Sequence, residues 1–172
     1  MNRRRTRWIG YGLIAGALAA ILFFQWPGWC ILEIHRAGNS GDVVLCARMY
    51  SGEEFTLSFT HSVNRRPVED TLRVEGDHLV IVRSRFDAFG AGMPESSTIE
   101  GTLTVEKDGR LIWEVNRVTP NITVRVGRVS DHILTIKGQQ IHLSDLAEGG
   151  AGLTFQVRLA HMPEIMKGRC VS

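Results

Sequence analysis

The residues of this chain that could do chemistry are concentrated between Phe59 and Glu95, where histidine, serine, carboxylates and glycines lie close together in the sequence. His61 and Ser62 are the right residue types for a general base and a nucleophile. Adjacent residues of a strand face opposite sides of the sheet, however, so His61 and Ser62 cannot act on each other. We therefore expect no serine-hydrolase mechanism and name no catalytic residue.

Carboxylates of the same stretch suggest a second kind of chemistry. Glu69 and Glu95 could meet His61 in a metal site or in an acid and base pair. The six histidines are scattered, and the metal-binding patterns HxH and HExxH do not occur. We expect no metal and no cofactor. A metal-binding or enzymatic domain that uses His61, Glu69 and Glu95 is kept as the alternative.

The segment FGAGMPE, residues 89–95, predicts a shaped loop. Gly90 and Gly92 permit a positive φ, and Pro94 fixes the direction in which the chain leaves. Such a loop can present backbone amides to an anion, although it lacks the lysine and the following helix of a phosphate loop. A simple turn between strands is the other interpretation. The candidate ligand- or partner-binding residues are therefore His61, Ser62, Glu69, Gly90, Gly92, Pro94 and Glu95.

Strands must position these residues, because apolar and polar residues alternate with a period of two along most of the chain after residue 30. The alternation is clear in residues 55–61, 101–106, 111–115, 122–126 and 153–159. Glycine-containing turn signals separate these segments at short intervals. The pattern predicts an all-β domain, either an antiparallel β-sandwich or a partly closed barrel. One short helical turn is expected between Leu143 and Ala147, with Ser144 as its cap.

The N-terminal segment predicts a membrane anchor. Residues 8–26, WIGYGLIAGALAAILFFQW, carry no charge, and as a helix they would extend about 28 Å, close to the thickness of a bilayer core. Arginines at positions 3, 4, 5 and 7 would stay in the cytoplasm and place the rest of the chain outside. We therefore divide the chain into residues 1–29, a basic tail and transmembrane signal-anchor, and residues 30–172, an exported all-β domain.

A cleaved signal peptide is the competing interpretation of this segment. It predicts small residues at a cleavage site, whereas the apolar run ends in the bulky sequence FFQWPGW, residues 23–29. Gly12, Gly16 and Ala20 recur every fourth residue and would let another helix approach closely. The same spacing also arises by chance in segments rich in glycine and alanine.

The charge of the chain argues against nucleic-acid binding. The formal net charge is +2, and the four N-terminal arginines contribute +4, so the other residues together carry −2. A nucleic-acid-binding domain usually carries its basic excess as a patch on the folded part. We therefore expect no nucleic-acid partner.

Three cysteines, Cys30, Cys46 and Cys170, follow the apolar segment and would lie in an oxidising compartment. Cys30 begins one expected strand and Cys46 lies in the next, so a Cys30–Cys46 disulfide across this hairpin fits the geometry. A Cys30–Cys170 disulfide fits equally well, because the last strand of a sandwich often returns beside the first. Three unpaired cysteines are the remaining interpretation.

Three short motifs carry a resemblance to a known family: THSV at residues 60–63, PVE at 67–69 and GAGMP at 90–94. Together they resemble an uncharacterised family, the membrane-anchored domain of unknown function encoded beside the membrane component of TAXI-type TRAP solute transporters in bacteria and archaea. The likeness extends over residues 30–159. Met93 stands where that family usually has leucine, a substitution that cores tolerate.

The resemblance implies a partnership and not an activity. TAXI-type systems pair a periplasmic solute-binding protein with an ion-coupled permease, so a tethered β-domain in the periplasm would lie where the two meet. Our first hypothesis is thus a single-pass protein of the bacterial inner membrane that serves the transporter as a non-enzymatic accessory protein. The enzyme or metal-binding domain described above is the second hypothesis, and a binder of a small ligand inside a β-barrel is the third.

Overall fold

The computed structural model of the protein describes residues 16, 29–38, 41–61, 65–89, 93–160 and 170–171. The predicted anchor thus lies outside the described residues except for Gly16, which is helical and has open space where a Cβ would lie. In the part of the chain that is described, no helix is long and apolar enough to cross a membrane. Gly12 and Ala20 also lie outside it.

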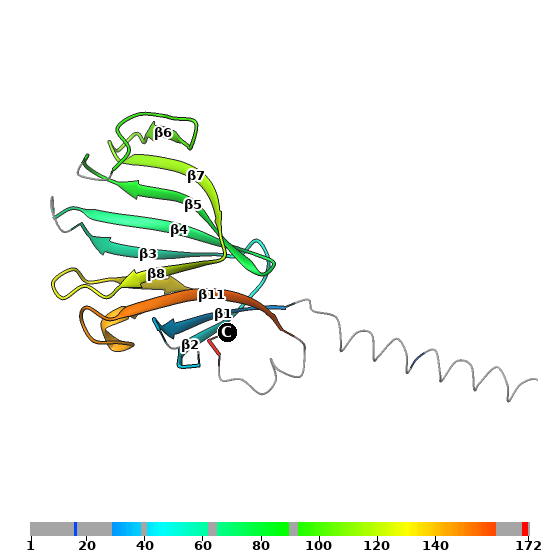
Figure 1. The fold of residues 1–172 in the computed structure, drawn as a ribbon. Coiled ribbons are helices and arrows are strands. Elements are labelled where there is room, and N and C mark those ends of the chain that lie inside the picture. Colours follow the sequence, from blue (N-terminus) through cyan, green and yellow to red (C-terminus); the bar gives the residue numbers. More distant parts are fainter. Residues whose placement is uncertain are drawn as a thin grey trace, which may run out of the picture.

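The described domain consists of two antiparallel sheets (Figure 1). The four-stranded sheet has the order β2-β1-β11-β8 and the seven-stranded sheet the order β10-β9-β3-β4-β5-β7-β6. Their bounds are β1 Trp29–Arg36, β2 Val43–Met49, β3 Glu54–Thr60, β4 Pro67–Glu75, β5 His78–Phe86, β6 Thr102–Val105, β7 Leu111–Thr119, β8 Asn121–Arg125, β9 Ile133–Ile136, β10 Gln139–His142 and β11 Gly152–Ala160. The all-β prediction is confirmed, and the two sheets do not close into a barrel among the described residues.

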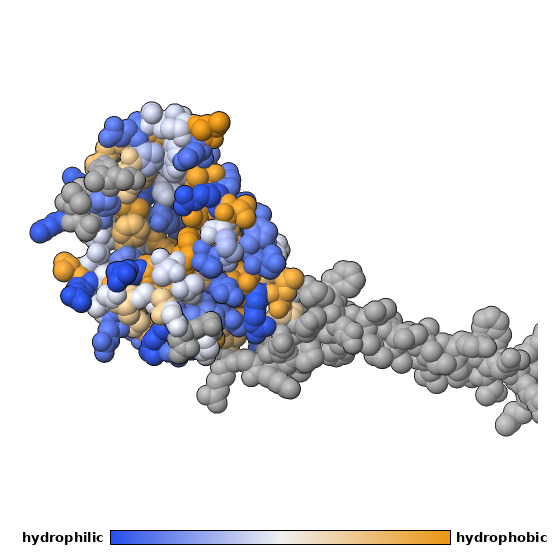
Figure 2. Space-filling view, in the orientation of Figure 1, coloured by the Kyte–Doolittle hydropathy of each residue, from blue (hydrophilic) through white to orange (hydrophobic). Residues whose placement is uncertain are grey.

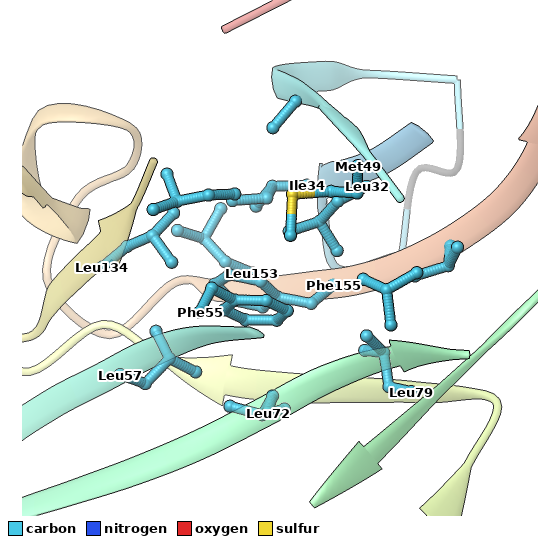
Figure 3. Packing of buried hydrophobic residues seen from close by; sticks show 14 of the residues in the cluster. Leu32, Ile34, Met49, Phe55, Leu57, Leu72, Leu79, Leu134, Leu153 and Phe155 are labelled. Atoms are coloured by element: carbon cyan, nitrogen blue, oxygen red, sulfur yellow. The ribbon is translucent and has the colours of Figure 1, made fainter. Parts of the chain in front are cut away.

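The core lies between the two sheets because alternate residues of each strand face the other sheet. Phe55 of β3 and Phe155 of β11 stack across this space with ring centroids 6.3 Å apart. Other buried side chains around this pair include Leu32, Ile34, Met49, Leu57, Leu72, Leu79, Leu134 and Leu153 (Figure 3). On the outside, hydrophilic and hydrophobic residues are interspersed across the visible face (Figure 2). Among the described residues the space between the sheets is filled by side chains, so a ligand site inside a barrel has no support.

The domain has two ends that are far apart. The entry end carries Trp29, the first residue of β1, and the turn between β4 and β5, whose Gly76 carbonyl accepts a hydrogen bond of 3.2 Å from the Cys30 thiol. The distal end carries the loop after β3, the loop between β8 and β9, and the residues before β11. Arg125, the last residue of β8, pairs there with Gly152. In Figure 1 β1 begins at the right and the loop after β8 lies at the left.

The disulfide joins Cys46 to Cys170, so the expected Cys30–Cys46 bridge is wrong. The register of the β1–β2 hairpin explains the error: Cys30 pairs with Met49, and Cys46 pairs with Glu33. The two cysteines therefore face opposite sides of the sheet, and Cys30 is a free thiol in the core. Burial, assisted by the charge of Asp77, raises the pKa of the Cys30 thiol.

A 3-10 helix from Leu143 to Asp145 follows β10. The helical turn predicted near Leu143 is thus present, but Ser144 lies inside it and does not cap it. His142 occupies the N-cap position and makes no side-chain capping hydrogen bond. Leu143 is the buried residue of this turn and belongs to the core.

Candidate functional site

A basic hollow of about 620 Å³ lies at the distal end, between the end of β3 and the loop that follows β8. Among the described residues that line it, four side chains are nitrogen bases and none is a carboxylate. The lining residues are Phe59, Thr60, His61, Arg125, Val126, Gly127, Arg128, Ser130, His132 and Gly150. We refer to this set as the basic hollow.

His61 is held by its backbone at the mouth of the loop that joins β3 to β4. Its N–H donates a hydrogen bond of 2.8 Å to the Arg66 carbonyl, and its carbonyl accepts one of 2.9 Å from the Arg65 N–H. The side chain is half-buried. Because both backbone groups are hydrogen-bonded, His61 has a fixed place in the wall of the basic hollow.

His132 is fixed by Gly127 and Phe59. The Gly127 backbone N–H donates to His132 Nδ1 at 3.3 Å, and the Phe59 ring stacks on the imidazole with centroids 5.3 Å apart and planes 16° from parallel. Nδ1 also lies 3.2 Å from the Ser130 carbonyl oxygen, so this ring nitrogen is held between the Gly127 N–H and the Ser130 carbonyl. Nε2 is the ring nitrogen that neither of these two groups engages. Phe59 adds an apolar surface to the same hollow.

Arg125 and Arg128 bind backbone carbonyls and make no ion pair with a described carboxylate. Arg125 Nη1 donates to the Gly150 carbonyl at 3.2 Å, and Arg128 Nε donates to the Gly149 carbonyl at 3.3 Å. A Cβ on Gly149 would lie 3.0 Å from Arg128 Cγ, so the absence of a side chain there lets Arg128 pack against the chain. By contrast, other arginines pair with carboxylates: Arg66 with Asp87, Arg73 with Glu75, Arg83 with Glu54, Arg85 with Glu106, and Arg110 with Asp108.

A smaller cleft of about 270 Å³ lies beside the basic hollow and shares Phe59 with it. Asp70 of β4 lines this cleft and accepts a hydrogen bond of 2.5 Å from the Ser84 hydroxyl of β5. Burial raises the pKa of Asp70, an effect that the Ser84 hydrogen bond partly offsets and the charge of Glu69 increases. Met93 and Pro94 of the glycine-rich segment also line this cleft, as do Trp113, Glu100 and Arg117.

The structure separates the three residues of the enzyme or metal hypothesis. His61 lines the basic hollow, whereas Glu69 lies 3.6 Å from Arg85 and lines a different hollow with Ser58 and Asp87. Glu95 is exposed. Among the described residues no group of three His, Cys, Asp or Glu side chains could hold a metal ion. Of the other candidates, Pro94 lines the Asp70 cleft, and Ser62, Gly90 and Gly92 lie outside the described residues.

Arg125, Arg128 and His132 are not among the residues predicted from the sequence. Their local signal is the segment RVGRVSDH, residues 125–132, in which two arginines flank a glycine between two strands. This segment becomes informative only once β9 is known to pair with β3, because that pairing brings it beside His61.

Fold and hollow together define a small antiparallel β-sandwich with a basic, ligand-sized hollow at one end. The chain belongs to the family of the domain of unknown function DUF1850, whose model matches residues 55–143, more than half of its 172 residues. The matched region contains the four bases of the basic hollow and ends before Gly150. No curated protein and no solved structure matches the chain.

Proposed function

We propose that this DUF1850 protein is a membrane-anchored periplasmic accessory protein of a TAXI-type TRAP solute transporter in a bacterial inner membrane, and that it is not an enzyme. The observation that carries the proposal is that the DUF1850 domain follows an uncharged segment, residues 8–26, long enough to cross a bilayer as a helix. The Cys46–Cys170 disulfide adds support, because such bonds persist in the oxidising periplasm and are rare in the cytosol.

The position of the basic hollow fits a role away from the membrane surface. The eight residues of β1 extend about 26 Å from the entry end toward the distal end. If the chain is anchored before Trp29, the hollow faces the periplasm, where a solute-binding protein and the outer loops of a permease would be reached. Geometry gives the enzymatic alternative no support, because His61, Glu69 and Glu95 lie in separate places.

Affinity purification of the full-length protein from its native membrane in mild detergent, followed by mass spectrometry, tests the proposal. We expect a multi-span permease, a solute-binding protein or both to be recovered with it. A Gly16→Ile variant should weaken the recovery of the permease if the anchor packs through its small residues. Ala17→Ile is the matched control, because it places the same isoleucine side chain about 100° around the helix.

The two results are separate. Recovery of the protein alone from the native membrane would contradict the accessory role. Recovery of the permease that is equal for wild type, Gly16→Ile and Ala17→Ile would contradict only the packing of the anchor through Gly16.

A further inference from the structure

We propose that the basic hollow is a binding site for a small soluble oxyanion, a carboxylate or phosphate compound, coordinated by Arg125, Arg128 and His132. The inference goes beyond the accessory role proposed above. Only the choice of a soluble anion over a lipid headgroup rests on that role.

The charge of the hollow is the first argument. Arg125 and Arg128 each bring a positively charged guanidinium to the hollow, and no carboxylate is among the described residues that line it with them. A carboxylate does occur nearby in the sequence, because Asp131 lies between Ser130 and His132. Its side chain, however, pairs with the His142 ring at 2.9 Å. An anion in the hollow would therefore offset two positive charges that the described residues leave without an ion pair.

The available donors are the second argument. A guanidinium has five N–H donors, and the hydrogen bonds to Gly150 and Gly149 each use only one. His132 adds its ring nitrogen Nε2, which neither Gly127 nor the Ser130 carbonyl engages and which donates when the ring is protonated. Donors of this kind match the two oxygens of a carboxylate or the three of a phosphate, and charge assistance makes such bonds roughly twice as strong as neutral ones.

Size and position limit the ligand. A volume of about 620 Å³ lies within the usual range of small-molecule sites, and the Phe59 ring offers an apolar surface to a carbon skeleton. The hollow is about 26 Å from the entry end, a distance set by β1, so a headgroup of the anchoring membrane would not reach it. A soluble organic acid or phosphate compound is the ligand class that fits.

Isothermal titration of the full-length protein in a neutral detergent tests this proposal with two probes, succinate and inorganic phosphate. We expect saturable binding of at least one probe, with a dissociation constant of about 1 mM or tighter, and weaker binding at higher salt. Succinamide, the uncharged analogue of succinate, should not bind. The measurement needs no partner protein, so it can fail or succeed independently of the accessory role.

Arg125→Gln and Arg128→Gln should each weaken binding about ten-fold or more, because each removes charge-assisted hydrogen bonds. Arg36→Gln is the matched control: Arg36 also lies toward the distal end and is exposed like Arg125 and Arg128, but it does not line the basic hollow and pairs with Asp42 at 2.9 Å. The affinity of Arg36→Gln for the anion should be unchanged, and thermal unfolding should show that all three variants fold.

Absence of binding for both anions would overturn the proposal, and so would binding that neither Arg125→Gln nor Arg128→Gln alters. The same titration in nanodiscs of phosphatidylcholine and of phosphatidylglycerol distinguishes a soluble phosphate compound from a lipid headgroup as the ligand. Equal affinity in both is expected for a soluble ligand. Loss of binding in phosphatidylglycerol nanodiscs would show that a lipid headgroup occupies the hollow. It would overturn the proposal that the ligand is a soluble anion.

Discussion

Gly127 and His132 are joined by a hydrogen bond from the Gly127 backbone N–H to the ring nitrogen Nδ1, 3.3 Å long, which spans the loop between β8 and β9. The same loop carries Arg128, and Arg125 is the last residue of the strand before it. One short loop, tied to a histidine at its far end, thus positions three of the four bases of the hollow.

Gly127→Ala should disrupt this loop. A Cβ on Gly127 would overlap the Ser130 carbonyl oxygen and lie 3.1 Å from the His132 ring, so the backbone must shift. We expect anion affinity to fall about ten-fold, in line with the loss of one or two charge-assisted hydrogen bonds, when it is measured by titration with succinate.

The matched control for this change is Gly109→Ala in the turn between β6 and β7. Gly109 has a φ of 87° and open space where a Cβ would lie. Alanine there should cost about 1–2 kcal/mol of stability because of the left-handed backbone, yet leave anion affinity unchanged. Equal loss of affinity in both variants would mean that Gly127 acts through overall stability.

Asp131→Asn should lower the pKa of His142. The hydrogen bond that the His142 ring donates to the Asp131 carboxylate is the main cause that raises the pKa of His142, and the charges of Asp131 and Asp145 add to it. Because the folded pKa is raised, the stabilisation is fully present below the ordinary histidine pKa of about 6.5 and is lost as pH rises through the folded value. NMR titration of the His142 ring measures the shift. Asp145→Asn is the control and should lower the pKa less.

Asp70→Asn should make stability less dependent on pH. Burial raises the folded pKa of Asp70, so between the unfolded pKa of about 3.9 and the folded value the native state binds the extra proton. Stability therefore falls as pH rises through this window, and a neutral amide removes that loss. Urea unfolding between pH 4 and pH 7 should show a flatter profile and a more stable variant at neutral pH.

Ser84→Ala gives the opposite test at the same site. It removes the hydrogen bond that lowers the pKa of Asp70, so the pH dependence should become steeper, and stability at neutral pH should fall by about 1–3 kcal/mol. If Asp70→Asn and Ser84→Ala changed the pH dependence of stability in the same direction, burial of the Asp70 carboxylate would not be the cause of that dependence.

The strands were predictable because their signal is local. Alternation of apolar and polar residues in segments such as 55–61 and 153–159 depends only on which side chains a single strand buries. The helical turn after β10 was also found locally, although its cap was not. Local sequence patterns, however, do not determine that the two sheets have four and seven strands, or which strand lies at each edge.

The candidate site was only partly predictable for the same reason. His61 is predictable because it continues a strand pattern into a polar stretch, but its neighbours in the hollow come from residues 125–132, more than sixty positions later. Glu69 was named from proximity in sequence, and the strand places it in a different hollow from His61. Long-range pairing, here of β3 with β9, decides which charged residues meet.

Loss of the disulfide should cost more stability than loss of the free thiol. Cys46 and Cys170 are 124 positions apart, so the bond restricts a long loop in the unfolded chain, and it also fixes residues 170–171 along β2, where the Val171 N–H donates to the Cys46 carbonyl at 2.9 Å. Cys46→Ala and Cys170→Ala should each lower the free energy of unfolding by about 2–5 kcal/mol. Either change breaks the same bond, so the double variant should lose about as much as each single one.

Thiol counting checks the pairing itself before any variant is made. Unfolded but unreduced protein from the native membrane should contain one reactive thiol, that of Cys30, and reduction should raise the number to the three cysteines of the chain. Cys30→Ala should therefore abolish the reactive thiol, whereas Cys46→Ala should leave two, those of Cys30 and Cys170. Two reactive thiols in Cys30→Ala would mean that Cys30 belongs to the bond, because its former partner and the third cysteine would then both be free.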